Sequence, residues 1–132
     1  MDLKAQMGQF LAPEFTLAQL AEKLFQAETD PDCVVMRQWI YGEEETCREL
    51  TRAQVNNRIK VVAARLQQVA EPGTRVAILA GNSPEYVFGF LGALYAGMVP
   101  IPLYDPNEPG HSDHLKAVFG DCEPSIVVTN RV

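Results

Sequence analysis

The sequence predicts an α/β domain in which helices cover a parallel sheet. Short apolar runs of strand length alternate with helical patterns, which is the order typical of a layered α/β domain. One of these runs, TRVAILA at 74–80, is apolar almost throughout, as in a strand covered on both faces. The chain has 132 residues, 47% hydrophobic and 21% charged, which is close to the average for globular proteins and enough to form a core.

The first helix is expected near the N-terminus, after a flexible lead-in over residues 1–13. Thr16 and Gln19 have the spacing of a capping box, in which each side chain accepts a hydrogen bond from the other residue's backbone N–H. Leucines and alanines at helical spacing follow, so the pattern predicts a helix over about 17–28. Residues 14–132 are interpreted as one subdomain.

A small β-hairpin is expected near residues 33–50. The segment CVVMRQWIY (33–41) is rich in β-branched and aromatic residues, and TCREL (46–50) is a short return strand. The glutamates between them, Glu43 to Glu45, are interpreted as the solvated tip of the hairpin. A metal site at these glutamates is the less favoured alternative, because successive side chains of a strand point in different directions.

A long helix follows the hairpin. Thr51 and Gln54 form a second capping-box spacing, and Glu71-Pro72-Gly73 is expected to end the helix. Apolar residues recur every third or fourth position over about five turns and predict one buried stripe. Its members are Val55, Ile59, Val62, Leu66 and Val69.

The uncharged tract from Tyr86 to Tyr104 is interpreted as a buried helix and a strand, without a transmembrane span. Ser83 and Pro84 predict the N-cap and the first position of a helix. Gly97 is expected to close it after about fourteen residues, which are too few to cross a bilayer.

A stripe of small residues, Gly89, Ala93 and Ala96, is expected to let this helix lie close to a sheet. The alternative is a membrane helix-dimer motif of the small-xxx-small type. The next segment, MVPIPLY (98–104), is expected to be extended, with its prolines at the start of a strand or on an unpaired side.

The C-terminal part predicts one more helix and one more strand. HSDHLKAVFGDC (111–122) is expected to be a helix capped by Ser112 or Asp113, and EPSIVVTN (123–130) a buried strand. No helix follows to cover that strand, so the sequence looks cut at an exposed parallel edge. This edge is a candidate surface for a homodimer.

Charge and cysteine content narrow the class of protein. The net charge is −6 and no cluster of lysine or arginine exists, which argues against nucleic-acid binding. Cys33, Cys47 and Cys122 lie far apart, so they indicate neither a disulfide framework nor a zinc site and fit a reducing cytoplasm. They are expected to be small core residues. The N-terminus has no pattern of a secretory signal, and the expected location is cytoplasmic.

The best candidate for a phosphate site is the turn AGNSPE, Ala80 to Glu85, because such turns present helix N-termini to anions. It lacks both glycine-rich nucleotide motifs. Pro84 has no amide hydrogen to donate, and Glu85 adds negative charge, so a structural helix cap is favoured.

The two histidines also offer little chemistry. His111 and His114, with Asp113 between them, could share a metal on one helix face, but no further ligand cluster is visible and this site is not favoured. No grouping of serine, histidine and aspartate, or of cysteine and histidine, suggests a nucleophile. The residues therefore predict no catalytic, cofactor-binding or metal-binding residue.

Three segments resemble the N-terminal part of the adenylate-forming enzymes. They are ELTRAQVNNRIKVVAARLQ (49–67), FLGALYAGMVPIPLYDP (90–106) and PGHSDHLKAVFGDCEPSIVVT (109–129). Within that superfamily the chain is most similar to the fatty acyl-AMP ligases, which are relatives of the acyl-CoA synthetases. The third segment is the one that leans towards the AMP ligases.

The resemblance implies a parent enzyme that condenses a fatty acid with ATP, using Mg²⁺, and passes the acyl-adenylate to an acyl carrier or polyketide synthase. It also implies that the matched segments are structural elements, since the family's phosphate loop, ribose-binding motif and catalytic lysine are not found in them. The segment is therefore expected to be inactive by itself and to pack against the remainder of the ligase chain. The alternatives are a stand-alone protein-interaction module derived from this fold, a fatty acyl-CoA synthetase fragment and a small flavodoxin-like nucleotide binder.

Overall fold

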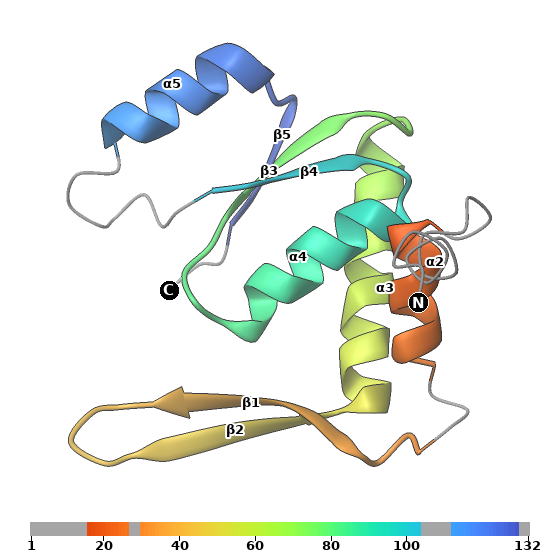
Figure 1. Cartoon of the computed structure of the whole chain (residues 1–132), viewed down its shortest axis with the longest axis vertical. Helices are drawn as coiled ribbons and strands as arrows, with labels where there is room; N and C mark the ends of the chain where they lie inside the picture. Colours follow the sequence, from red (N-terminus) through yellow and green to blue (C-terminus); the bar gives the residue numbers. More distant parts are fainter. Residues whose placement is uncertain (1–15, 27–29, 104–111, 130–132) are drawn as a thin grey trace, which may run out of the picture.

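The computed structural model describes residues 16–26, 30–103 and 112–129. Its elements follow the predicted order of a helix, a hairpin and then alternating helices and strands (Figure 1). They are α2 (Leu17–Leu24), β1 (Val34–Ile40), β2 (Thr46–Thr51), α3 (Arg52–Val69), β3 (Arg75–Leu79), α4 (Pro84–Tyr95), β4 (Val99–Pro102), α5 (Ser112–Cys122) and β5 (Ile126–Thr129). The expected lead-in over residues 1–13 lies outside the described residues.

Three parallel strands form the main sheet in the order β4-β3-β5. The connection from β3 to β4 contains α4, and the connection from β4 to β5 passes across β3 in the opposite direction and contains α5. Because parallel crossovers are right-handed, the two helices cover opposite faces of the sheet. Figure 1 shows α5 above the strands and α4 below them. The predicted α/β fold class is confirmed.

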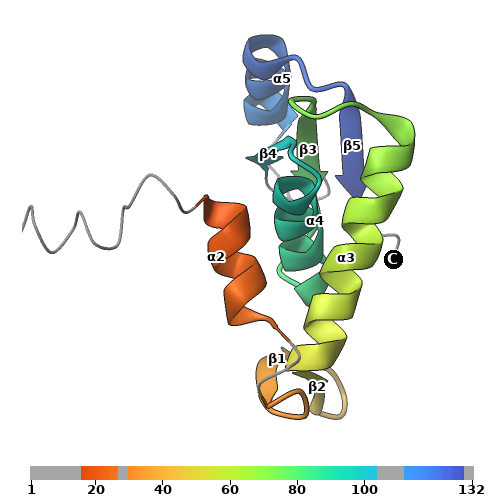
Figure 2. The ribbon, with the colours of Figure 1, turned by 90° about the vertical axis from the view of Figure 1, so that its right-hand side faces the viewer.

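The core lies between this sheet and the helices below it. Val76 and Ile78 of β3 are fully buried against Ala63 and Leu66 of α3 and Ala93 of α4. A second cluster joins the hairpin to the same helices through Leu50, Val55, Ile59 and Phe88. α4 lies between α2 and α3, so it contacts both helices and the sheet (Figure 2).

The predicted stripe of α3 is confirmed except at its end. Val55, Ile59 and Leu66 are buried and Val62 is half-buried, but Val69 is 70% exposed. Successive side chains of a helix are rotated by roughly 100° about its axis. On this basis the middle of the buried face of α3 lies between the directions of Ile59 and Ala63. Val69 points well away from that direction.

Both capping boxes are present. The Thr16 Oγ1 accepts from the Gln19 N–H at 3.1 Å and the Gln19 Oε1 from the Thr16 N–H at 2.9 Å. Thr51 and Gln54 make the same pair of bonds at 3.2 and 2.9 Å. α2 nevertheless ends at Leu24, before the predicted residue 28, and the Arg52 guanidinium donates to the Leu24 carbonyl. A side chain from α3 thus satisfies an acceptor that continued helix would have used.

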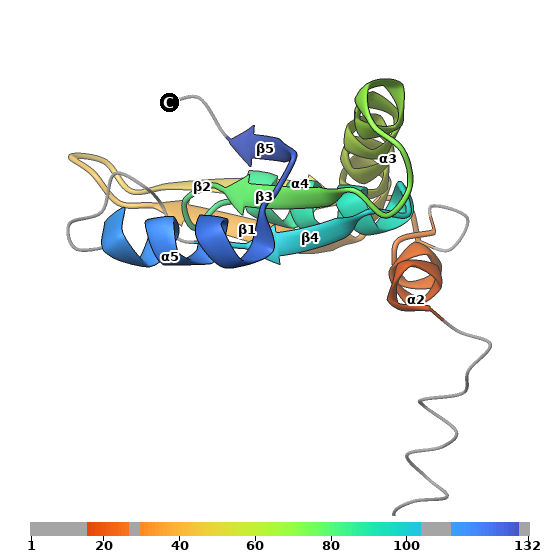
Figure 3. The same ribbon diagram turned by 90° about the horizontal axis from the view of Figure 1, so that it is seen from above.

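The hairpin of β1 and β2 is antiparallel, as predicted, with a register shift between Val34 and Met36. The tip residues Glu43 to Glu45 are exposed, which confirms their interpretation as a solvated turn. Figure 1 shows the hairpin on the side of α4 away from the three-stranded sheet, and in the view from above (Figure 3) the hairpin, α4 and β3 overlap. Its outer surface has no covering layer in the described part of the chain.

The tract from Tyr86 to Tyr104 changes from helix to strand, as far as it is described. α4 ends at Tyr95 after 12 residues, and Gly97 has φ of 75°. The N–H groups of Val99 and Leu103 donate to the carbonyls of Thr74 and Ile78 at 2.9 and 3.1 Å. The backbone N–H groups of the odd-numbered residues of β4 therefore point towards β3, and the backbone nitrogens of the even-numbered residues point away from it. Both prolines of β4 therefore occupy the unpaired side of an edge strand, as expected. None of the described helices is long and apolar enough to cross a membrane.

Replacing Gly97 tests the left-handed turn that ends α4. A Cβ there would have its nearest neighbour, the Pro72 Cβ, at 3.6 Å, so space is sufficient and only the backbone conformation is strained. We expect Gly97→Ala to lower the free energy of unfolding by about 1 kcal/mol in urea denaturation. Gly97→Asn, which tolerates this conformation better, should lose less, and equal losses for the two variants would contradict the assignment.

Three further predictions about the fold are wrong. Cys33 and Cys47 are exposed and Cys122 is only half-buried, so none is a core residue. Cys47 lies on the outer face of the hairpin opposite Trp39, which is itself 54% exposed. α5 already includes Ser112 and Asp113, so neither is the residue before the helix.

The third of these wrong predictions is the burial of the last strand. β5 alternates between half-buried and exposed residues, and Val127 is 48% exposed. The reason is its position, because β5 is an edge strand whose outer side has no neighbour among the described strands. Ile126 and Val128 on its other face do pack against the core.

Candidate functional site

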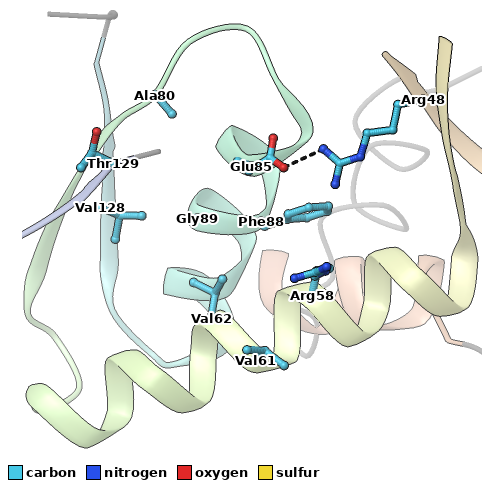
Figure 4. A pocket seen from close by; sticks show the side chains of 10 residues that line it. All are labelled: Arg48, Arg58, Val61, Val62, Ala80, Glu85, Phe88, Gly89, Val128 and Thr129. Atoms are coloured by element: carbon cyan, nitrogen blue, oxygen red, sulfur yellow. Dashed lines mark hydrogen bonds and ion pairs between the residues drawn. The ribbon is translucent and has the colours of Figure 1, made fainter. Parts of the chain in front are cut away.

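A pocket of about 270 Å³ lies where α3, α4 and the carboxyl ends of β3 and β5 meet (Figure 4). Its walls are apolar and come from Val61, Val62, Ala80, Phe88, Gly89 and Val128. Three charged side chains also line it, which are Arg48, Arg58 and Glu85. The pocket therefore combines an apolar interior with a charged end.

The topology of the sheet explains why a pocket lies here. After β3 the chain adds β4 at one edge of the sheet, and after β4 it returns across β3 to add β5 at the other edge. The order of strands therefore reverses between β3 and β5, which makes this place a topological switch point. In open α/β sheets, crevices form at the carboxyl ends of the strands beside such a point. Ala80 follows β3 directly, and Thr129 is the last residue of β5.

Gly89, the first member of the predicted small-residue stripe of α4, lines the pocket. A Cβ on Gly89 would lie 3.3 Å from the Val128 Cγ1 and 3.5 Å from the Ile78 Cγ2, so this residue faces the sheet as predicted. Gly92, which the sequence analysis did not single out, faces α3 instead. A Cβ there would lie 2.6 Å from the Val62 Cγ1.

An ion pair closes the charged end of the pocket. The Arg48 Nη1 of β2 donates to the Glu85 Oε1 of α4 at 2.7 Å, and the two side chains are 37% and 40% exposed. Burial raises the pKa of the Glu85 carboxyl, but the hydrogen bond and charge of Arg48, together with bonds to backbone and Ser83, outweigh this and lower the pKa. Glu85 is therefore ionised at neutral pH, and the pair ties the hairpin to the first turn of α4.

Removing this pair should have a small, pH-dependent effect. Because both side chains are more than a third exposed, we expect Arg48→Gln to cost at most about 1 kcal/mol at pH 7. The folded-state pKa of Glu85 is lowered, so the contribution is present above the ordinary glutamate pKa of about 4.3 and is lost as pH falls further. Urea denaturation of both proteins at pH 7 and pH 3 measures this, and a difference that grows at pH 3 would contradict it.

The turn from Ala80 to Glu85 does not fit phosphate. Ser83 precedes α4 as predicted, but its hydroxyl makes no cap to the helix and donates instead to the Gly81 carbonyl at 3.3 Å. Pro84 occupies the first helical position and has no N–H to offer an anion. Because Arg48 pairs with Glu85, the two side chains offer the phosphates of ATP no net positive charge at this turn. Ser83 thus has the N-cap position predicted from the sequence, but the side-chain hydrogen bond of a cap is absent.

The remaining candidate residues are not brought together. His114 and Asp113 are exposed on α5, and His111 lies outside the described residues. Over residues 16–26, 30–103 and 112–129, no group of three or more histidine, cysteine, aspartate or glutamate side chains could hold a metal ion.

The charged end of the pocket was not predicted from the sequence. Arg48 and Glu85 are 37 residues apart, and Arg58 lies on a third element. Only the tertiary structure places these three side chains around Phe88. The one sequence signal was an acidic residue in the first turn of a helix, which by itself indicates no more than a favourable interaction with the helix dipole.

Comparison with protein families shows to which family this chain belongs. Residues 25–132 match the AMP-binding enzyme family. The chain belongs to the AMP-binding enzymes. This agrees with the sequence resemblance to the adenylate-forming superfamily.

Two curated AMP-binding enzymes are similar to the chain. It is 54% identical over 82 residues to the long-chain-fatty-acid–AMP ligase FadD32 of Mycolicibacterium smegmatis, covering 62% of this chain and 13% of FadD32. It is 37% identical over 105 residues to FadD26 of Mycobacterium tuberculosis, also a long-chain-fatty-acid–AMP ligase, covering 78% of this chain and 18% of FadD26. The chain thus spans less than a fifth of either relative.

A solved structure of the same class is also similar. It is the fatty acyl-adenylate ligase of Legionella pneumophila in complex with acyl adenylate and pyrophosphate. The TM-score is 0.67 at 28% identity, over 80% of this chain and 18% of the ligase chain. Both the sequence relatives and this structure support the fatty acyl-AMP ligase resemblance identified from the sequence.

Proposed function

We propose that this chain is the N-terminal part of a fatty acyl-AMP ligase, which activates a fatty acid with ATP to form an acyl-adenylate. The observation that supports this best is the 54% identity to FadD32 over 82 residues. ATP and Mg²⁺ would be bound by the rest of the ligase, since the family's phosphate loop and catalytic lysine are not found in the segments that resemble it. The acyl-adenylate would pass to an acyl carrier or a polyketide synthase in the cytoplasm.

In this proposal the chain has a structural role and is inactive alone. The clusters around Ile59 and Ile78 hold α3 and α4 on one face of the sheet. The open edge of β5 is the surface against which the remainder of the ligase would pack. In the absence of that remainder, the same edge would support pairing with a second copy.

A chimaera tests the proposal. The 82-residue stretch of M. smegmatis FadD32 that matches this chain is replaced by the residues of this chain. Fatty-acid-dependent exchange of pyrophosphate into ATP is then measured. We expect exchange within about tenfold of FadD32, equal to about 1.4 kcal/mol in the barrier, and no exchange by the 132-residue chain alone.

Two controls separate the outcomes. FadD32 lacking the stretch should show no exchange, and circular dichroism should show that the chimaera is folded. A folded chimaera without exchange would overturn the assignment to a fatty acyl-AMP ligase. Exchange by the isolated chain at the rate of FadD32 would overturn its structural role.

A further inference from the structure

The helix α2 presents its leucines to solvent. Leu17, Leu20 and Leu24 are 55%, 48% and 57% exposed, although they are the largest apolar side chains of the helix. Because helical residues three and seven positions apart lie on the same face, the three leucines form one leucine stripe. In a globular protein such a stripe is usually the face that packs against the rest of the molecule.

A different face of α2 makes the contact with the rest of the protein. Ala21 is buried and Ala18 is half-buried, and α2 contacts α4. These small side chains allow the helix to lie close to α4 but leave the leucine stripe outside the contact. Figure 2 shows α2 beside α4, with no other labelled element on the far side of α2. The stripe therefore has no covering element among the labelled helices and strands.

The segment before α2 has a matching apolar pattern. Its sequence is MDLKAQMGQFLAPEF (1–15), in which apolar residues follow the first leucine after four, seven and eight positions. They are Leu3, Met7, Phe10 and Leu11. This spacing is typical of an amphipathic helix. Pro13 cannot continue a helix, and the residue before a proline favours extended backbone, so the pattern predicts a helix over about 3–11.

The lengths of the segments fit a helical hairpin. Residues 12–15 lie between the predicted helix and Thr16, the N-cap of α2. Two antiparallel helices are commonly joined by a loop of about 2–5 residues. A helix over 3–11 would be roughly 13 Å long, and the 8 residues of α2 span about 12 Å. The predicted helix could therefore extend along the whole leucine stripe.

The short connection favours this segment over a second copy of the chain. Segments joined by a short linker meet at an effective concentration in the millimolar range. A stable interface between two proteins buries roughly 800 Å² on each partner, and three half-exposed leucine side chains supply much less than that. The stripe is thus too small to hold a second copy but sufficient for a tethered helix.

We propose that residues 3–11 form an amphipathic helix that packs on the leucine stripe of α2, with Met7 opposite Leu20. A helix shorter than roughly 12 residues is marginal in water, and Gly8 weakens it further, so it would form only on contact with the stripe. In this proposal the segment is not the flexible lead-in first expected. The inference goes beyond the proposed function because it involves no adenylation chemistry.

Nuclear Overhauser contacts in the full chain test the proposal directly. We expect contacts between the Phe10 ring and the methyl groups of Leu17 or Leu20. In a mixture of isotopically labelled and unlabelled chains, these contacts should lie within one chain. Contacts between two chains would assign the stripe to a second copy, and the absence of contacts would leave it uncovered. Either result would overturn the proposal.

Paired substitutions measure the coupling between the two segments. Met7→Gln and Leu20→Gln should each speed amide hydrogen exchange in α2 at least about fivefold. The double variant should exchange at the rate of the faster single variant, within about twofold, because either change already separates the segments. Circular dichroism checks that each variant is folded. Independent effects that multiply in the double variant would contradict the contact.

Val61→Gln is the matched control. Val61 is 49% exposed, as Leu20 is 48% exposed, but it lies on α3 and lines the pocket on the other side of α4. Its substitution should leave exchange in α2 unchanged, and Met7→Gln should keep its full effect in that background. These measurements need neither ATP nor any other part of a ligase, so their failure is distinguishable from failure of the pyrophosphate exchange.

Discussion

Gly92→Ala is expected to separate α3 from α4 and to destabilise the protein by about 2 kcal/mol. The added Cβ would lie 2.6 Å from the Val62 Cγ1, 2.8 Å from the Val62 Cβ and 3.3 Å from the Ala63 backbone nitrogen. A β-branched side chain cannot rotate its own Cβ away, so the helices must move. Such overpacking costs about 1–3 kcal/mol, which exceeds the gain of up to about 1 kcal/mol in helix propensity.

Gly120→Ala is the matched control for this substitution. Gly120 is also helical, in α5, but a Cβ there has nothing within 4 Å. Only the propensity gain remains, so we expect a stabilisation of about 0.5–1 kcal/mol. Urea denaturation of both variants provides the comparison. If Gly92→Ala were as stable as Gly120→Ala, the close approach of α3 and α4 would be refuted.

Among substitutions that shorten a single side chain, Ile59→Ala is expected to have the largest effect. It should lower the free energy of unfolding by about 2–5 kcal/mol. Ile59 is fully buried in the cluster that joins Leu50 of the hairpin to Phe88 of α4. Its removal leaves a cavity among three elements and weakens the attachment of the hairpin. Since small domains have free energies of unfolding of about 5–15 kcal/mol, the transition midpoint should fall substantially.

Val69→Ala serves as the control on the same helix. Val69 belongs to the apolar pattern that the sequence shows, yet its side chain is 70% exposed. We expect a change within about 0.5 kcal/mol. A loss comparable to that of Ile59→Ala would mean that Val69 is covered and that α3 is rotated relative to the sheet and α4.

Local features of this fold could be predicted because their causes lie within a few residues. Each capping box is a bond between residues three apart, and the end of α4 depends on the left-handed conformation of Gly97. The apolar run at 74–80 indicated a strand covered on both faces, and Val76, Ala77 and Ile78 of β3 are indeed fully buried. Such features need no knowledge of the remaining chain.

Burial was less predictable at the edges of the structure. The cysteines and the last strand are apolar enough for a core, but Cys47 lies on the open face of the hairpin and β5 at the edge of the sheet. Composition measures how readily a side chain is buried, whereas burial itself requires a neighbouring layer. Which face has that layer depends on how the elements assemble.

The order of elements, the starts of α2 and α3, the end of α4 and the burial of β3 on both faces follow from the linear pattern of apolar, capping and turn residues. The pocket does not. Its charged end depends on Arg48, Arg58 and Glu85 from three elements, and its apolar walls on the close approach of α4 to β5 at Gly89. Contacts of this kind join residues far apart in the chain, and no local pattern encodes the distance between them; only the packed sheet and helices establish it.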